Sequence, residues 1–245
     1  MPIIYLSPST QEWNPYITGG TEEYYMNQIA DAMIPYLRSC GIRYVRNTPE
    51  MTAASSIAAS NAGNFDLHLA LHSNASPESI AGQRTGCEVY YDSRSWWGQK
   101  AAEIIAANLK AIYPDPNNVR TLTTTSLGEV NRTRAPAVLI EFAYHDNIDD
   151  ANWIISNIQP IAYNVVLSLT EYFGLPFIFP KPARVGMVVT SGARLNVRDR
   201  PTVNSPVIGR LNNGQTVTVW GEWNGWYVIE SNYITGYVSS QYIML

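Results

Sequence analysis

The chain has 245 residues, of which 46% are hydrophobic and 15% charged, and its formal net charge is −4 at pH 7. This length suits one large domain or two smaller ones with a real core. The sequence contains no block of Lys and Arg, which argues against nucleic acid as the main partner, and no apolar run of the ~20 residues that span a bilayer.

Strand-like and helix-like segments alternate up to about residue 176. The expected strands are 3–6, 42–45, 67–72, 88–91 and 137–142. The expected helices are 22–39, 52–62, 96–112 and 149–173, and we expect the last of these to bend or break at Pro160. This alternation predicts an α/β domain, with a mostly parallel sheet flanked by helices.

The chain changes character near residue 180. Pro180 and Pro182 predict a linker over residues 177–183, between a first domain at 1–176 and a second at 184–245. The second domain contains only short β-type runs separated by Gly and Asn-Gly signals, at 195–198, 206–209, 216–220, 226–229 and 236–238. About 60 residues of closely spaced strands predict a small β-barrel, in which Trp220 and Trp226 either fill the core or stack on a ligand.

Two apolar runs of the first domain each end on a side chain that can do chemistry. His72 ends the run at 67–72, and Glu141 ends the run at 137–142. Buried parallel strands read as continuous apolar runs, and catalytic groups gather where such strands end. The pair indicates a metal-assisted hydrolase, because a catalytic zinc is usually held by three protein ligands of the imidazole, carboxylate or thiolate type.

Only three histidines are present, His68, His72 and His145. Four residues of strand separate the first two by ~13 Å, so we expect His68 to be structural. A loop that leaves the sheet edge after the strand at 137–142 could bring His145 back toward His72, while Asp146 and Asn147 more simply cap the next helix.

Two glutamates have competing interpretations. Glu23 either complements the dipole at a helix start or extends the apolar stripe of Met26 and Met33 and points inward, where it would need a partner such as a metal. Glu141 is either a general base or the partner of Arg132 or Arg134 in a structural ion pair.

Residues 3 to 175 resemble the zinc-dependent N-acetylmuramoyl-L-alanine amidases of the amidase-3 type. The supporting motifs are Glu23 after Gly19-Gly20, Leu71-His72-Ser73-Asn74-Ala75, Gly86-Cys87-Glu88-Val89-Tyr90 and Pro136-Ala137-Val138-Leu139-Ile140-Glu141 with Asn147 after it. The resemblance implies that Glu23 and His72 are metal ligands for Zn²⁺ and that Glu141 is the catalytic acid/base.

One departure from this family affects the metal site. The family usually has a first metal histidine after strand one, but this chain reads Ser7-Pro8-Ser9-Thr10-Gln11-Glu12 there. Our hypothesis is that His145 replaces the missing ligand from the opposite loop, with Gln11 or Glu12 nearby.

Residues 184–245 resemble a bacterial SH3-type domain, on the motifs Leu195-Asn196-Val197-Arg198-Asp199-Arg200-Pro201, Asn224-Gly225-Trp226-Tyr227 and Thr235-Gly236-Tyr237-Val238. Such domains commonly hold lytic enzymes on the cell wall. The resemblances imply a hydrolase that uses zinc-activated water to cut the amide between N-acetylmuramic acid and L-alanine in peptidoglycan. It would act outside the cell or in the cell wall, although no signal peptide is visible. Two alternatives stay open, an inactive wall-binding protein and a zinc peptidase acting on a related peptide.

Overall fold

The computed structural model describes residues 1–232 and 234–245, and the chain divides into two compact units. The larger unit contains Ile3–Met33 and Tyr44–Tyr172, and the smaller contains Met1–Pro2, Ile34–Arg43 and Phe173–Leu245. Residues 34–43 therefore group with the carboxyl-terminal part, which the composition of the sequence does not indicate. Within the described residues, no helix has both the length and the hydropathy needed to cross a bilayer.

The larger unit is built on a six-stranded sheet in the order β2-β1-β3-β6-β4-β5. Its strands are β1 (Ile3–Pro8), β2 (Arg43–Arg46), β3 (Leu67–Asn74), β4 (Cys87–Tyr91), β5 (Val119–Thr123) and β6 (Ala137–Tyr144). The pairs β1–β3, β3–β6 and β4–β5 are parallel, whereas β4 runs antiparallel to β6. The fold is α/β as predicted, but the sheet is mixed. The central strands β3 and β6 are buried almost throughout, which explains their continuous apolar runs.

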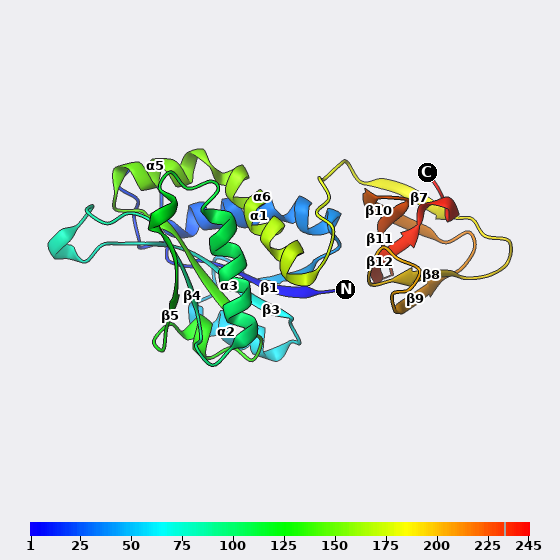
Figure 1. Cartoon of the computed structure of the whole chain (residues 1–245), viewed down its shortest axis with the longest axis horizontal. Coiled ribbons are helices and arrows are strands. Elements are labelled where there is room, and N and C mark those ends of the chain that lie inside the picture. Colours follow the sequence, from blue (N-terminus) through cyan, green and yellow to red (C-terminus); the bar gives the residue numbers. More distant parts are fainter. Residues whose placement is uncertain (233) are drawn as a thin grey trace. The chain divides into compact units, whose positions relative to one another are not determined.

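The helices of the chain are α1 (Glu22–Ser39), α2 (Ala53–Ala62), α3 (Trp96–Leu109), α4 (Gly128–Asn131), α5 (Ile148–Ser156) and α6 (Ile158–Phe173), with short 3-10 turns η1 (Glu78–Ile80), η2 (Pro116–Asn118) and η3 (Ser240–Tyr242). Figure 1 shows α3 alongside β4 and β5, against which it packs. Side-chain caps set the helix starts at Thr52, Ser95 and Asn147. The loop that carries η1 projects from the end of β3 (Figure 1).

The predicted break at Pro160 lies three residues too late. α5 ends at Ser156, and Asn157 separates it from α6, which begins at Ile158. Pro160 therefore stands in the first turn of α6, where its missing N–H costs no helical hydrogen bond. The side chain of Asn157 donates from Nδ2 to the carbonyl of Trp153 at 2.7 Å, which closes the end of α5.

The carboxyl-terminal strands form a seven-stranded sheet in the order β13-β7-β10-β11-β12-β8-β9. They are β7 (Arg184–Val188), β8 (Leu195–Arg198), β9 (Val207–Leu211), β10 (Thr216–Trp223), β11 (Trp226–Ser231), β12 (Ile234–Ser239) and β13 (Ile243–Met244). Their pairings are antiparallel. Asn224 and Gly225 join β10 to β11 with φ angles of 44° and 82°, as the Asn-Gly signal indicates. Closure into a barrel stays a prediction.

Aliphatic side chains make the core of this sheet. The buried cluster consists of Val188, Leu195, Val197, Leu211, Val217, Val219, Ile229, Val238 and Ile243. Trp220 and Trp226 are only half-buried and lie outside this cluster. The two rings therefore lie outside the buried aliphatic core, and the second interpretation, that they stack on a ligand, stays a prediction.

Candidate functional site

Three polar side chains stand in one row across the sheet of the larger unit. His72 on β3 pairs in register with Glu141 on β6, and Glu141 pairs in turn with Glu88 on β4. Directly paired residues of adjacent strands project from the same face of a sheet. The structure therefore brings His72 and Glu141 side by side near the carboxyl ends of β3 and β6, which is where the apolar runs of the sequence place them.

The carboxylate that reaches His72 from α1 belongs to Glu22, not Glu23. Glu22 is buried, and its Oε1 accepts a hydrogen bond from Nδ1 of His72 at 2.8 Å. Glu23 is half-buried, and its Oε1 accepts from Nδ2 of Asn27 at 3.3 Å. Glu23 is therefore not the acid that meets His72; residue 22, four positions before the buried Met26, takes that place.

A second buried carboxylate, Glu129 on the short helix α4, contacts the other ring nitrogen of His72. Its Oε2 accepts from Nε2 of His72 at 3.0 Å, while its Oε1 lies 3.2 Å from Nε2 of His68 and accepts from Oγ of Ser7 at 2.5 Å. On its far side, Nδ1 of His68 lies 2.9 Å from Oγ of Ser60. His68 is thus structural in its contacts, and Glu129 ties it to His72.

Sequence reasoning missed Glu129. A helix of four residues is too short to show an apolar periodicity, so Glu129 reads as one polar residue in a polar loop. The available signal was indirect. Two histidines on one face of a buried strand need hydrogen-bond partners, and Glu129 is an acid between β5 and β6 that no other motif had used.

Two amides extend the contacts around Glu22. Nδ2 of Asn14 donates to Oε2 of Glu22 at 2.7 Å and to Oε1 of Gln11 at 3.0 Å. The side-chain amide of Gln11 also approaches Nδ1 of His72, with Nε2 at 3.3 Å. The Gln11 amide and the Glu22 carboxylate therefore converge on the same ring nitrogen, and Glu129 occupies the other.

The electrostatics of this cluster favour a charged His72. Burial lowers the pKa of His72, but hydrogen bonds to Glu129 and Glu22 and their negative charges raise the pKa well above its ordinary value. The same bonds oppose the effect of burial on both acids, so that the pKa of Glu22 is lowered and that of Glu129 is lowered strongly. These directions favour the protonated imidazole of His72 between the carboxylates of Glu22 and Glu129.

Glu141 behaves differently from the other two acids. Its Oε2 atom is buried and has no hydrogen-bond partner among the described residues, and the structure records no ion pair between Glu141 and Arg132 or Arg134. Burial raises the pKa of Glu141 to about 7; the His72 charge opposes this rise, while Glu22, Glu88 and Glu129 add to it. A carboxyl group with this pKa can both take and return a proton near neutral pH.

His145 lies close to this cluster but faces another group. It is buried, and its Nδ1 lies 3.1 Å from Oγ and 3.0 Å from the carbonyl oxygen of Ser73. Its ring packs against Tyr16, whose hydroxyl donates to Oγ of Ser73 at 2.8 Å. These contacts do not bring His145 to Glu22 or to Nδ1 of His72, so the geometry does not support its predicted role as the replacement ligand.

The two residues after His145, Asp146 and Asn147, make structural hydrogen bonds. Asn147 caps α5 by accepting from the backbone N–H groups of residues 149 and 150, as expected. Asp146 accepts from the backbone N–H of Ser76 at 3.0 Å and of Gly82 at 2.7 Å. It thereby holds both ends of the loop that carries η1, next to the end of β3.

The donor set for a zinc ion is smaller than in the expected site. In the described part of the chain, no three side chains of the His, Cys, Asp or Glu type converge as a metal site. His72 Nδ1 and Glu22 Oε1 do converge, with the Gln11 amide as a third, neutral group. Glu129 stands behind the ring at Nε2, which is where the supporting carboxylate of a zinc-bound histidine belongs. The described residues therefore offer a metal two donors, Nδ1 of His72 and the Glu22 carboxylate, because Oε1 of Gln11 accepts from Asn14 and its Nε2 faces His72.

Several solved structures share the fold. The amidase AmiC2 of Nostoc punctiforme superposes with a TM-score of 0.62 at 15% identity, over 71% of this chain and 97% of that one. Cwp6 from Clostridium difficile gives 0.61 at 23% identity, over 70% and 29% of the two chains. The catalytic domain of the CD27L endolysin targeting Clostridia difficile gives 0.58 at 22%, over 70% and 98%. At these identities the likeness establishes the fold alone.

Two protein-family models match the chain. The bacterial SH3 domain matches residues 193–244, and N-acetylmuramoyl-L-alanine amidase matches residues 10–171. A search of the curated proteins gives no match. Because the second match spans well over half of the 245 residues, the chain belongs to the N-acetylmuramoyl-L-alanine amidase family and carries a bacterial SH3 domain after its amidase region.

Proposed function

We propose that this protein hydrolyses the amide bond between N-acetylmuramic acid and the L-alanine of the stem peptide in peptidoglycan. The observation that carries the proposal is Glu141, in register beside His72, whose buried Oε2 bonds none of the described residues and whose carboxyl group has a pKa raised to about 7. Hydrolysis of an amide needs a group that accepts a proton from water and later donates one to the departing amine. Glu141 is suited to both steps at one pH.

The other residues of the cluster would hold a zinc ion and orient its ligands. Nδ1 of His72 and the Glu22 carboxylate would bind zinc, the Gln11 amide would have to turn its oxygen toward them to supply a third donor, and Glu129 would fix the His72 ring through Nε2. When bound, zinc polarises the amide carbonyl and lowers the pKa of an attacking water. Zinc uptake at Nδ1 would displace the proton that His72 now donates to Glu22, so binding would release protons.

The carboxyl-terminal region would keep the enzyme on its substrate. In this proposal residues 1–176 are the catalytic domain, 177–183 the linker and 184–245 the wall-binding domain, and the protein acts outside the cell or in the cell wall. A bacterial SH3 domain that binds peptidoglycan would raise the local concentration of scissile bonds around the catalytic domain.

Product analysis on purified peptidoglycan tests the activity. We expect new amino-terminal alanine, without new reducing sugar ends and without new amino termini of other residues. New termini elsewhere in the peptide would replace the proposal with a zinc peptidase. Binding to peptidoglycan without any cleavage, even with zinc supplied, would favour an inactive wall-binding protein. Two observations fit this second function: the usual first metal histidine is missing, and both ring nitrogens of His72 contact carboxylates.

Metal analysis of single variants shows which of the candidate residues bind zinc. We expect about one zinc per chain in the parent protein, and loss of that zinc in His72→Ala and Glu22→Gln, because each removes a donor at Nδ1 of the site. Glu23→Gln is the matched control and should keep its zinc, because this neighbouring acid faces Asn27. Loss of zinc in Glu23→Gln but not in Glu22→Gln would contradict the assignment, and loss in His145→Ala alone would restore His145 as the ligand.

A further inference from the structure

Two adjacent tryptophans begin α3 and lie on the surface of the larger unit. Trp96 is 64% exposed and Trp97 is 52% exposed, and their rings meet edge to face with centroids 4.5 Å apart. The next residue, Gly98, is the one that turns inward, because a Cβ added to it would lie 3.1 Å from the carbonyl oxygen of Ala137 at the start of β6. The two indoles therefore stand on the outer side of the helix, and exposed apolar groups that gather in this way mark interaction surfaces.

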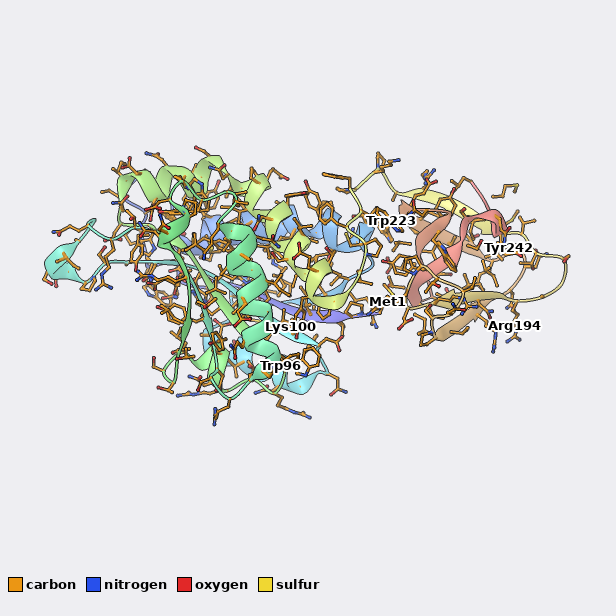
Figure 2. All side chains as sticks on the ribbon, in the orientation of Figure 1. Met1, Trp96, Lys100, Arg194, Trp223 and Tyr242 are labelled. Carbon is orange, nitrogen blue, oxygen red and sulfur yellow. The ribbon has the colours of Figure 1, made fainter. Side chains whose placement is uncertain are left out.

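Lys100 adds a positive charge to these rings. Its Nζ lies 5.8 Å from the ring centroid of Trp96, 5.4 Å from that of Trp97 and 5.9 Å from that of Tyr172. Figure 2 shows Trp96 and Lys100 on successive turns of α3. A cation within about 6 Å of a ring is attracted to its face, so the rings hold the ammonium group in place. Its N–H donors stay available for an anion, because the structure records no ion pair of Lys100 with the described residues.

The neighbouring charges at this end of α3 are engaged elsewhere. Arg94 donates to both carboxylate oxygens of Asp92, from Nη2 to Oδ2 at 2.6 Å and from Nε to Oδ1 at 3.0 Å. Glu103, one turn after Lys100, accepts from Nε2 of Gln99 at 2.8 Å. The first turn of a helix is also electrically positive, because its N–H groups point outward. The surface formed by Trp96, Trp97 and Lys100 is therefore suited to a ligand that has an apolar face and an anion beside it.

This surface lies away from the catalytic cluster. Gly98 meets Ala137, whereas Glu141 stands four residues further along β6, which is about 13 Å of strand. β4 leads into α3 and runs antiparallel to β6, so α3 begins at the opposite end of the sheet from the row of His72 and Glu141. A ligand held at this surface leaves the catalytic residues uncovered.

We propose that this surface binds a glycan strand from which the stem peptides have been removed, a proposal that rests on the proposed function. In the hydrolysis, water adds to the lactyl carbonyl, the C–N bond breaks, and the amine leaves as amino-terminal alanine. Each N-acetylmuramic acid then keeps a free lactyl carboxylate, so the neutral sugar chain becomes anionic. The enzyme would thus be retained on the product of its own reaction.

The position of the charge favours this product over the stem peptide. The C–H face of a pyranose packs on the flat face of an indole, which is electrically negative. The lactyl group is attached to the sugar ring itself, so a sugar stacked on Trp96 or Trp97 brings its carboxylate within reach of Lys100. The free carboxylates of the stem peptide are separated from the sugar by at least one amino acid.

Calorimetric titration of the full chain tests this proposal without any cleavage. One probe is the tetrasaccharide of alternating N-acetylglucosamine and N-acetylmuramic acid with free lactyl groups, and the other is N-acetylchitotetraose, which has the same length and no carboxylate. We expect the acidic probe to bind at least about tenfold more tightly, as for one charge-assisted hydrogen bond. Lys100→Gln should remove this preference. Trp96→Ala should weaken binding of both probes, and Trp96→Tyr, which keeps an aromatic face, should retain most of the affinity.

Two controls match these variants. Lys110→Gln changes an exposed lysine at the other end of α3, and Trp223→Ala changes an exposed tryptophan of the carboxyl-terminal unit, so both should bind like the parent. Equal binding of the two probes, or loss of binding in Trp223→Ala but not in Trp96→Ala, would overturn the proposal. Binding of phosphatidylglycerol vesicles without binding of either tetrasaccharide would assign the surface to a membrane and overturn it as well. Release of amino-terminal alanine from peptidoglycan is measured separately, so absence of glycan binding would leave the amidase proposal standing.

Discussion

Replacing Glu141 with Gln should abolish most of the amidase activity and yet make the protein more stable at alkaline pH. Removal of a general acid/base costs about 10²- to 10⁴-fold in rate, so kcat should fall in this range on peptidoglycan fragments. The carboxyl group of Glu141 has a pKa of about 7 in the folded protein, against an ordinary value of 4.5. That difference corresponds to about 3 kcal/mol of destabilisation once both states are ionised.

The pH dependence of stability follows from the upward direction of this pKa shift. In the unfolded chain the carboxyl group ionises near pH 4.5, whereas in the folded chain it keeps its proton until about pH 7. The contribution of Glu141 to stability therefore falls as the pH rises from 4.5 to 7 and stays low above 7. The advantage of Glu141→Gln over the parent should grow by about 2–3 kcal/mol between pH 5 and pH 8.

Urea unfolding of both proteins at pH 5 and pH 8, in the presence of a chelator, measures this difference. The control is Glu103→Gln, which changes an exposed acid on α3 and should track the parent at both pH values. A Glu141→Gln protein that is less stable than the parent at pH 8 would mean that the carboxylate is paired in the folded state. Undiminished turnover in the same variant would remove Glu141 from the chemistry.

Glu129→Ala should cause the largest loss of stability of any change in the cluster. It removes the acceptor of Nε2 of His72, a partner of His68 and the acceptor of the Ser7 hydroxyl at once. Breaking a buried ion pair by removing one partner costs about 3–5 kcal/mol, because the other charge stays buried. Urea unfolding at pH 7 should show a loss of this size.

The more conservative Glu129→Gln separates the role of Glu129 in positioning the His72 ring from its role in the stability of the fold. An amide can still accept one hydrogen bond, so part of the stability should return, but it cannot hold the His72 ring as a carboxylate does. Substitutions of such supporting groups weaken metal binding about 10- to 100-fold, and competition with a chromophoric chelator would measure the zinc affinity. A Glu129→Gln protein that binds zinc like the parent would show that Glu129 serves folding only.

Much of the larger unit was predictable because its elements are regular. Continuous apolar runs identified β3 and β6, and their lengths were close to those of the observed strands. β5 was missed because Val119–Thr123 is short and polar and lies at the edge of the sheet, where little of it is buried. The antiparallel direction of β4 was not predicted either, since direction depends on how the chain crosses the sheet and not on local pattern.

The site was predictable only where a strand or helix directly presents the residue. The apolar runs of β3 and β6 placed His72 and Glu141 at one edge of the sheet, but only the structure decided between Glu22 and Glu23. The start of α1 at Glu22 was predicted correctly, so the error lay in the choice of residue on the helix and not in the helix boundary. Glu22 and Glu23 lie four and three positions before Met26, so the apolar stripe of the helix alone did not separate them.

The sequence by itself determined the α/β class, the change to β-structure after residue 183, the convergence of His72 with Glu141 and the absence of the usual first metal histidine. Only the tertiary structure decided that Glu22 and Glu129 contact the two ring nitrogens of His72, that His145 faces Ser73, and that Arg194, Trp226 and Tyr242 line one pocket. The physical reason is that these hydrogen bonds, and the pKa shifts that come with them, arise between residues 50 to 72 positions apart in the sequence, whereas periodicity reports only on neighbours along one element.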